Sequence, residues 1–193
     1  MDKIIDLLSV EDSILEKLNM SATSATFAIG TDMAPFVYAL ATNDSLIHLD
    51  ISGHMMGDKG GIALGKALQT NRSLQSLRWD GNGTLLPGFN GFKIGLERNS
   101  VLTNMPLPIL DISSALKLAS GDVNKLQIVI NQISEAIARN QSPKSKFSLG
   151  EGYSQHISLG VRYCLLLTSP SPHNTHDCFF RVLSKEKNSR NSS

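Results

Sequence analysis

The chain has 193 residues, of which 41% are hydrophobic and 18% are charged. This composition is typical of a globular protein, and the length allows one domain or one domain with an appendage. The formal net charge is +1, which argues against a nucleic-acid partner because domains that bind nucleic acid normally carry a basic stripe. Residues 1–140 carry 11 basic and 14 acidic side chains, whereas residues 141–193 carry seven basic and three acidic ones. This change indicates a boundary near residue 140.

The N-terminal sequence and the cysteines bear on localisation. The stretch Met1–Asp12 is rich in acidic side chains, which is not the pattern of a secretory signal. The longest strongly apolar run, Tyr163–Leu167, has five residues, whereas a membrane-spanning helix needs about 20. Cys164 and Cys178 are too few for a disulfide framework. We therefore expect a soluble, cytoplasmic protein without a membrane segment of its own.

A leucine-spaced motif recurs between positions 1 and 110. It follows the pattern Leu-x-x-Leu-x-Leu and begins at Leu15, Leu46, Leu74 and Leu102, so that the last two steps are equal and the first is slightly longer. Such a period is the signature of a repeat protein, and the motif is that of the long, ribonuclease-inhibitor-like leucine-rich repeat. The motif predicts four parallel strands, near Glu16–Ser21, Leu46–Ser52, Ser76–Trp79 and Thr103–Leu107.

The segments between these strands favour helices. Residues 31–41 place Pro35 in a first helical turn, and Asp58 can cap a helix over residues 59–69. A third helix, over residues 89–97, is predicted to be weak because Gly91 and Gly95 each cost about 1 kcal/mol relative to alanine. We therefore predict an α/β fold in which a leucine-rich-repeat solenoid fragment of about four units occupies residues 1–110.

One of these helical segments imitates a phosphate-binding loop. Residues 60–67 read G-x-x-x-x-G-K-A, but Ala67 stands where a serine or threonine would reach magnesium. Ile62 and Leu64 also fit the apolar side of a helix that packs against a strand. We therefore interpret the segment as a helix and expect no cofactor.

Residues 111–140 are predicted to form a cap and a long amphipathic helix. Residues 111–119 form the short cap helix, and the helix over residues 122–139 carries large aliphatic side chains at three- and four-residue spacing. This stripe comprises Val123, Leu126, Ile130, Ile133 and Ile137. It can cover the last repeat, or Leu126, Ile130, Ile133 and Ile137 can serve self-association in a homodimer. Residues 141–193, with three Ser-Pro pairs, are predicted to be a mostly disordered tail.

Polar residues alternate with apolar ones along the predicted strands. Since successive side chains of a strand point to opposite faces, the polar ones form a stripe on the concave face, where we expect protein partners to bind. This stripe comprises Lys17, Asn19, His48, Asp50, Ser52, Ser76, Arg78 and Asp80. Asp50 and Arg78 can pair across neighbouring strands.

No constellation of residues predicts catalysis or metal binding. His48 and Asp50 are interpreted as exposed strand residues and His54 as a turn residue, because no further ligands are clustered with them. The cysteines and histidines after residue 160 fit no standard zinc spacing. No nucleophile has a neighbouring base in a supporting sequence context. We therefore expect that the chain is not an enzyme and binds no metal.

The stretches Ser45–Asn71, Ser73–Asp80 and Asn104–Lys117, the first with the string HLDISGHMMGDKG, closely resemble the late repeats and cap of the CARMIL family. The resemblance covers residues 1–146 and implies a scaffold that regulates actin filament organisation and capping. It also implies a cytoplasmic place, with the cytoskeleton or cell membrane as further sites for full-length members.

The resemblance leaves the partners open. It implies the actin capping machinery, although the family's capping-protein-binding motif cannot be aligned with this sequence. Two alternatives remain. One is a leucine-rich-repeat GTPase regulator, and the other is a truncated product with little function of its own.

Overall fold

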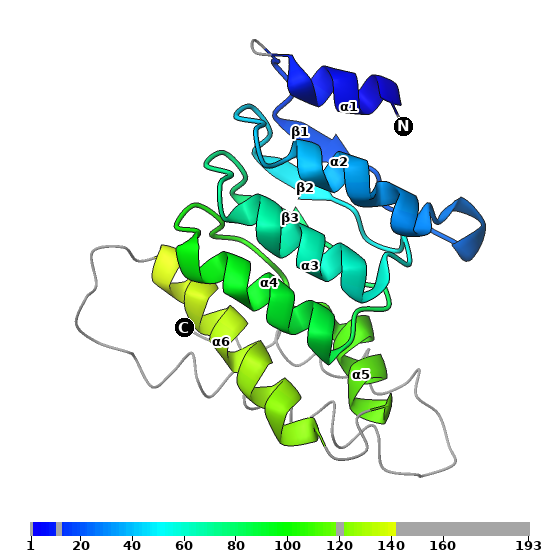
Figure 1. Ribbon diagram of the computed structural model, residues 1–193, viewed down its shortest axis with the longest axis vertical. Helices are drawn as coiled ribbons and strands as arrows, with labels where there is room; N and C mark the ends of the chain where they lie inside the picture. Colours follow the sequence, from blue (N-terminus) through cyan, green and yellow to red (C-terminus); the bar gives the residue numbers. More distant parts are fainter. Residues whose placement is uncertain (1, 11–12, 119–121, 142–193) are drawn as a thin grey trace, which may run out of the picture.

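Figure 1 shows the computed structural model, which describes residues 2–10, 13–118 and 122–141. The elements, with η for a 3-10 helix, are α1 (Asp2–Ser9), β1 (Lys17–Asn19), η1 (Ala25–Phe27), η2 (Gly30–Met33), α2 (Ala34–Ala39), β2 (His48–Asp50), α3 (Gly57–Leu68), β3 (Ser76–Arg78), α4 (Leu86–Arg98), α5 (Ile109–Leu118) and α6 (Val123–Gln141). The predicted disorder of residues 141–193 falls, except for residue 141, outside the described residues.

The three strands form one parallel sheet in the order β1-β2-β3. This sheet confirms the α/β class and the first three predicted strands. Helices α2, α3 and α4 lie side by side as one layer against the sheet (Figure 1). Of the predicted fourth strand, Thr103–Leu107, only a parallel bridge between Ser76 and Asn104 is formed, so the segment lies beside β3 without completing a strand. Pro106 and Pro108 lack the N–H groups that would continue the ladder.

The core lies between the sheet and the helix layer. Leu49 and Leu77 point into it and are 2% and 0% exposed. The ring of Trp79 stacks on Phe92 with centroids 4.6 Å apart and meets Phe89 edge-on at 5.8 Å. Aromatic pairs of this geometry add to the stabilisation that burial itself provides. The alternation read from the sequence therefore separates core side chains from surface side chains correctly.

Helices α3 and α4 touch through their backbones at glycines. A Cβ added to Gly61 would lie 2.8 Å from the carbonyl oxygen of Gly88, and one added to Gly65 would overlap the carbonyl of Gly91. The third predicted helix is present and longer than expected, since α4 extends over 13 residues despite its glycines. The intrinsic cost of these glycines is offset by a helix contact that no larger residue allows.

We expect Gly65→Ala to destabilise the chain by about 1–3 kcal/mol, because the new methyl group must push two helix backbones apart. Urea unfolding followed by the fluorescence of Trp79 measures this loss. Lys66→Ala, at the exposed neighbouring position, is the control and should change stability by less than about 0.5 kcal/mol. Equal effects of the two substitutions would contradict the role of the glycine contact.

A ladder of buried asparagines joins each unit to the one before it. The Nδ2 group of Asn71 donates to the carbonyls of Leu40 at 2.7 Å and Asn43 at 2.9 Å, while its Oδ1 accepts the N–H of Leu74 at 2.8 Å. Asn99 repeats this pattern one unit later with Leu68, Asn71 and Leu102. Asn43, Asn71 and Asn99 are each at most 4% exposed. The ladder therefore satisfies backbone groups that the core would otherwise leave unpaired.

Side chains of helix α6 take the place of an asparagine at the end of the ladder. Nη2 of Arg139 donates to the carbonyls of Leu96 at 2.9 Å and Asn99 at 2.7 Å, the two carbonyls that an asparagine of a following unit would bind. The Nδ2 group of Asn140 donates to the carbonyl of Leu102 at 2.9 Å. The helix thus closes the stack with side chains that replace the missing rung.

The apolar stripe of α6 is buried in its own chain. Leu126, Ile130 and Ile133 are each 1% exposed and Ile137 is 6% exposed, because α6 packs along α4 and touches α5. The assignment of these four residues to self-association is therefore wrong for the folded chain, and the alternative that they cover the last unit is correct. A homodimer formed through them would require α6 to leave α4.

We expect Arg139→Ala to lower the free energy of unfolding by about 1–3 kcal/mol, because it leaves backbone carbonyls without their donor. Chemical denaturation measures the loss. Arg98→Ala, at an exposed position on α4, is the matched control and should be nearly neutral. If both variants were as stable as the wild type, the imitation of a ladder rung by Arg139 would contribute nothing.

Candidate protein-interaction surface

The predicted polar stripe lies across the three strands in the expected register. Lys17 pairs with His48 and His48 with Ser76, while Asn19 pairs with Asp50 and Asp50 with Arg78. Lys17, Asn19, His48 and Arg78 are exposed, whereas Asp50 and Ser76 are partly buried. The sheet therefore brings these six side chains together as two adjacent rows on its open face, about 4.8 Å from strand to strand.

The predicted pair of Asp50 and Arg78 is present. The Nε of Arg78 lies 3.7 Å from Oδ2 of Asp50, and the two side chains are 68% and 18% exposed. An ion pair at such an exposed site contributes about 0–1 kcal/mol to stability. A second contact fixes the carboxylate of Asp50, since its Oδ1 accepts the N–H of Ser52 at 3.0 Å. The pair therefore shapes the surface rather than stabilising the fold.

Asp80 belongs to the fold more than to the stripe. Its Oδ1 accepts the N–H groups of Gly81 at 2.8 Å and of Leu110 at 3.0 Å, and also that of Asp111 at 3.2 Å. It thereby holds the start of α5 against the end of β3, because the first N–H groups of a helix have no partner within the helix. Its acceptor positions are occupied within the chain.

The structure refines the interpretation of His54 and confirms the interpretation of the imitated phosphate loop. His54 lies in the turn after β2, as expected, but it is 2% exposed and hydrogen-bonded, so its side chain belongs to the core. Residues 60–67 lie inside α3, and Gly60, Gly61 and Gly65 are buried by Met56 and by α4. No free N–H cradle for a phosphate exists within a helix, because its interior amides are bonded.

A hollow at the start of the strands extends the surface beyond the predicted residues. Its volume is about 500 Å³, and its lining includes Glu16, Ile47, Arg72 and Gln75. Ile14, also in the lining, is 95% exposed. The sequence-based prediction does not include these residues, although Ile47 and Gln75 also lie between the leucines of the motif, where side chains face away from the core. The hollow places two apolar side chains, Ile14 and Ile47, among polar and charged ones beside the stripe.

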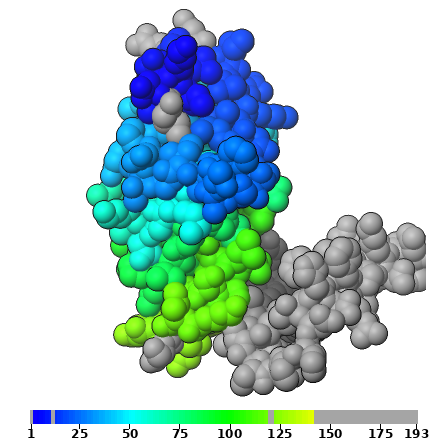
Figure 2. Space-filling view, turned by 90° about the vertical axis from the view of Figure 1, so that its right-hand side faces the viewer, coloured from blue at the N-terminus to red at the C-terminus, as the bar shows by residue number. Residues whose placement is uncertain are grey.

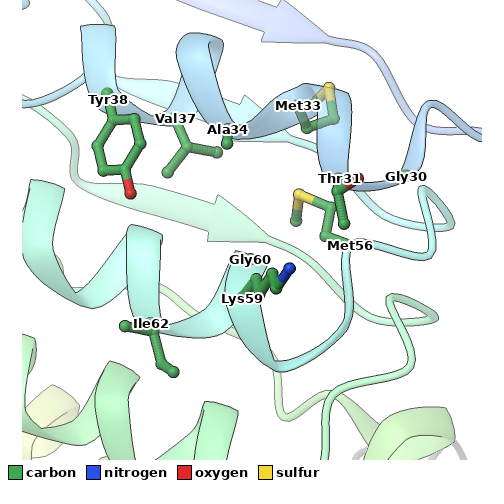
Figure 3. A pocket seen from close by; sticks show the side chains of 10 residues that line it. All are labelled: Gly30, Thr31, Met33, Ala34, Val37, Tyr38, Met56, Lys59, Gly60 and Ile62. Atoms are coloured by element: carbon green, nitrogen blue, oxygen red, sulfur yellow. The ribbon is translucent and has the colours of Figure 1, made fainter.

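A second hollow lies on the helix side, between η2, α2 and α3 (Figure 3). Its volume is about 220 Å³, and Met33, Val37 and Met56 form its apolar wall. Tyr38 and Lys59 are the ionisable side chains in the lining, which contains no carboxylate, histidine or cysteine. The hollow therefore offers no paired acid and base.

Asp111 is a buried carboxylate for which the sequence predicts no role. It is 2% exposed and accepts the N–H groups of Asn82 at 3.1 Å and Gly83 at 2.9 Å. Burial raises the pKa of Asp111 above its ordinary value, and the nearby charge of Asp80 adds to this, although the backbone amides of Gly83, Asn82 and Thr84 lower it. Asp111 joins α5 to the turn after β3, so its role is structural.

The raised pKa of Asp111 makes stability depend on pH. Since the folded chain holds this proton more tightly than the unfolded chain, the contribution of Asp111 is greatest below pH 3.8 and falls as the pH rises through the folded pKa. We expect the difference in unfolding free energy, wild type minus Asp111→Asn, to decrease between acidic and neutral pH. Urea titrations at a series of pH values test this, with the exposed Asp44→Asn as control. A constant difference would contradict the prediction.

Two further searches cover only the described part of the chain. No group of three or more histidine, cysteine, aspartate or glutamate side chains that could hold a metal is found among residues 2–10, 13–118 and 122–141. No helix within the same ranges is long and apolar enough to cross a membrane.

Comparison with known proteins identifies the family. No protein-family model matches the sequence. Protein CARMIL of Dictyostelium discoideum is 45% identical over 154 residues, which are 80% of this chain and 14% of that protein. The chain belongs to the CARMIL family. "Capping protein, Arp2/3 and myosin-I linker protein 3" of Homo sapiens is 36% identical over 119 residues, which are 62% of this chain and 8% of that protein.

The other similarities are more distant. "Rho GTPase-activating protein gacW" of Dictyostelium discoideum is 34% identical over 143 residues, 72% of this chain and 13% of that protein. Among solved structures, "Leiomodin-1 Actin-Binding Site 2 (ABS2)" matches with a TM-score of 0.51 and 14% identity, and covers 82% of this chain and 96% of that one. This structural likeness shows the fold alone. The chain thus spans a small part of the length of its CARMIL relatives.

Proposed function

We propose that the chain is part of a leucine-rich-repeat solenoid that binds proteins of the actin machinery without catalysing a reaction. The observation that carries this proposal is the stripe of Lys17, His48 and Ser76 beside Asn19, Asp50 and Arg78, aligned on three parallel strands. Repeat proteins use such concave sheet faces as binding surfaces. The units lie in chain order along the molecule (Figure 2), so the stripe crosses consecutive units.

The chemistry of the surface supports binding rather than catalysis. Its side chains are hydrogen-bond donors and acceptors spread over a sheet, with Arg78 as an exposed cation that can reach a partner. The hollow with Ile14 and Ile47 adds apolar area at the margin. Protein interfaces combine apolar area with hydrogen-bonding groups, and this surface offers both.

The proposal that the partners belong to the actin machinery rests on the relatives. The name of the human relative joins capping protein, Arp2/3 and myosin-I. Of these, Arp2/3 and myosin-I are the partners to test first, because the family's capping-protein-binding motif cannot be aligned here. A place in the cytoplasm beside the actin cytoskeleton follows from this proposal.

Binding assays with the full chain test the proposal. We expect the chain to bind Arp2/3 complex or a myosin-I, and Lys17→Glu with Arg78→Glu to weaken that binding at least tenfold, about 1.4 kcal/mol. Lys59→Glu with Lys66→Glu, two exposed lysines of α3 in the helix layer, changes the net charge equally and should leave binding unchanged. Biolayer interferometry measures both variants. Binding of neither protein, or equal loss in both variants, would refute the proposal.

A GTPase regulator is the second candidate, favoured by the similarity to the Rho GTPase-activating protein gacW. The matched part is 13% of that protein. In this reading Arg78 would have to act on the nucleotide of a bound GTPase, as arginines do in activating proteins. Single-turnover GTP hydrolysis by a Rho-family GTPase, with and without the chain, separates the two candidates. The interaction module predicts no acceleration.

A further inference from the structure

His54 occupies a position where this kind of repeat carries a residue that does not change its charge. The motif Leu46-x-x-Leu49-x-Ile51-x-x-His54 places the histidine at the ninth position, which is asparagine or cysteine in leucine-rich repeats. The next unit has Asn82 at the equivalent position. His54 and Asn82 thus form a second row of buried polar side chains beside the asparagine ladder, and His54 is the member of this row whose ring can take up a proton.

Both ring nitrogens of His54 bind the backbone of the preceding unit. Nε2 lies 2.5 Å from the carbonyl oxygen of Met20, and Nδ1 lies 3.4 Å from the amide nitrogen of Ile29. A carbonyl can only accept and an amide N–H can only donate, so these two contacts fit a neutral ring with its proton on Nε2. The carbonyl of His54 also accepts the N–H of Gly30 at 2.8 Å.

These bonds join the two ends of one segment to the second unit. The segment, residues 21–29, follows β1 in the unit that is slightly longer than the next two, and most of it is exposed. Phe27, in its short helix η1, is 69% exposed. The ring of His54 therefore holds a protruding segment with an aromatic side chain at its surface.

Asn82 shows what a residue with constant charge does at the equivalent place. Its Nδ2 donates to the carbonyls of Ile51 and Trp79, and its Oδ1 accepts the N–H of His54 at 3.0 Å. This set of bonds does not depend on pH in the physiological range, because an amide does not titrate there. A protonated His54 would direct a second N–H from Nδ1 at the N–H of Ile29, so that the bond becomes a repulsion between two donors.

The charged groups on the surrounding elements make no bond to the ring. Asp58 on α3 accepts the N–H groups of Leu85 and Gly88. Asp111 and Asp80, beyond Asn82, accept backbone amides of their own neighbours. Asp32 on η2 and Lys59 on α3 are not part of these bonds.

We propose that His54 is a proton-operated latch. When the ring is neutral, its Nδ1 accepts the N–H of Ile29, and when the ring is protonated this bond becomes a repulsion. The Ile29 end of residues 21–29 then loosens and the surface around Phe27 changes, while the N–H of Gly30 stays bonded to the carbonyl of His54. The latch would let acidification alter the exposed surface around Phe27 at the end of the strands. It rests on the contacts of His54 and does not depend on the proposed actin partners.

Nuclear magnetic resonance of the full chain tests the latch between about pH 8 and pH 5, the range in which histidines usually titrate. The nitrogen shifts of the His54 ring should report the neutral form with its proton on Nε2 at high pH. As the ring becomes protonated, the hydrogen-exchange protection factor of the Ile29 amide should fall at least tenfold. The amides inside α3 should keep their protection.

Two variants separate the latch from general acid loosening. His54→Asn, which repeats the residue at position 82, should remove the pH dependence at Ile29, whereas the exposed His48→Asn should keep it. An unchanged pH dependence in His54→Asn would overturn the proposal. So would a His54 ring that stays neutral throughout the range, or an Ile29 amide whose protection does not follow the ring. The last two readouts use the wild type and hold even if the variant does not fold.

Discussion

The stacking of the units depends on one repeated interaction, the asparagine ladder. Between consecutive units the chain leaves a helix and enters a strand, and the carbonyls at this turn are buried against the core. A single asparagine binds two carbonyls of the unit before it and accepts an amide three residues ahead of itself. Because Asn71 and Asn99 make the same bonds, the register of β2 on β1 is repeated in β3. The rows of polar side chains on the open face follow from that register.

The helices on the other side of the sheet have to match the spacing between the strands. Neighbouring strands are about 4.8 Å apart, whereas packed helices are usually about 8–10 Å apart, and this difference bends a stack of strand–helix units. The glycines of α3 and α4 bring the two backbones into contact and so reduce the difference locally. The glycine contact therefore lets the helix layer follow the spacing of the strands more closely.

The last unit shows how such a stack ends. Proline residues stop the sheet after Asn104, and α6 covers the exposed side of α4 with Leu126, Ile130, Ile133 and Ile137. Arg139 takes the place of an asparagine from another unit. The acidic pair Asp80 and Asp111 fastens α5 to the turn after β3. These contacts do not involve the open face of β1–β3, where we propose that partners bind.

The repeat period, the α/β class, the first three strands and the pairing of Asp50 with Arg78 were predictable from the sequence. They were predictable because leucine spacing and strand alternation are local patterns that indicate which side chains face the core. The equal spacing of Asn43, Asn71 and Asn99 is also a local signal of the ladder. What covers the stripe of α6, why α4 tolerates its glycines, and the burial of His54 and Asp111 could be known only from the packed chain. Each of these depends on which surfaces meet, and an apolar stripe or a lone polar residue has the same sequence whether its own chain or another molecule covers it.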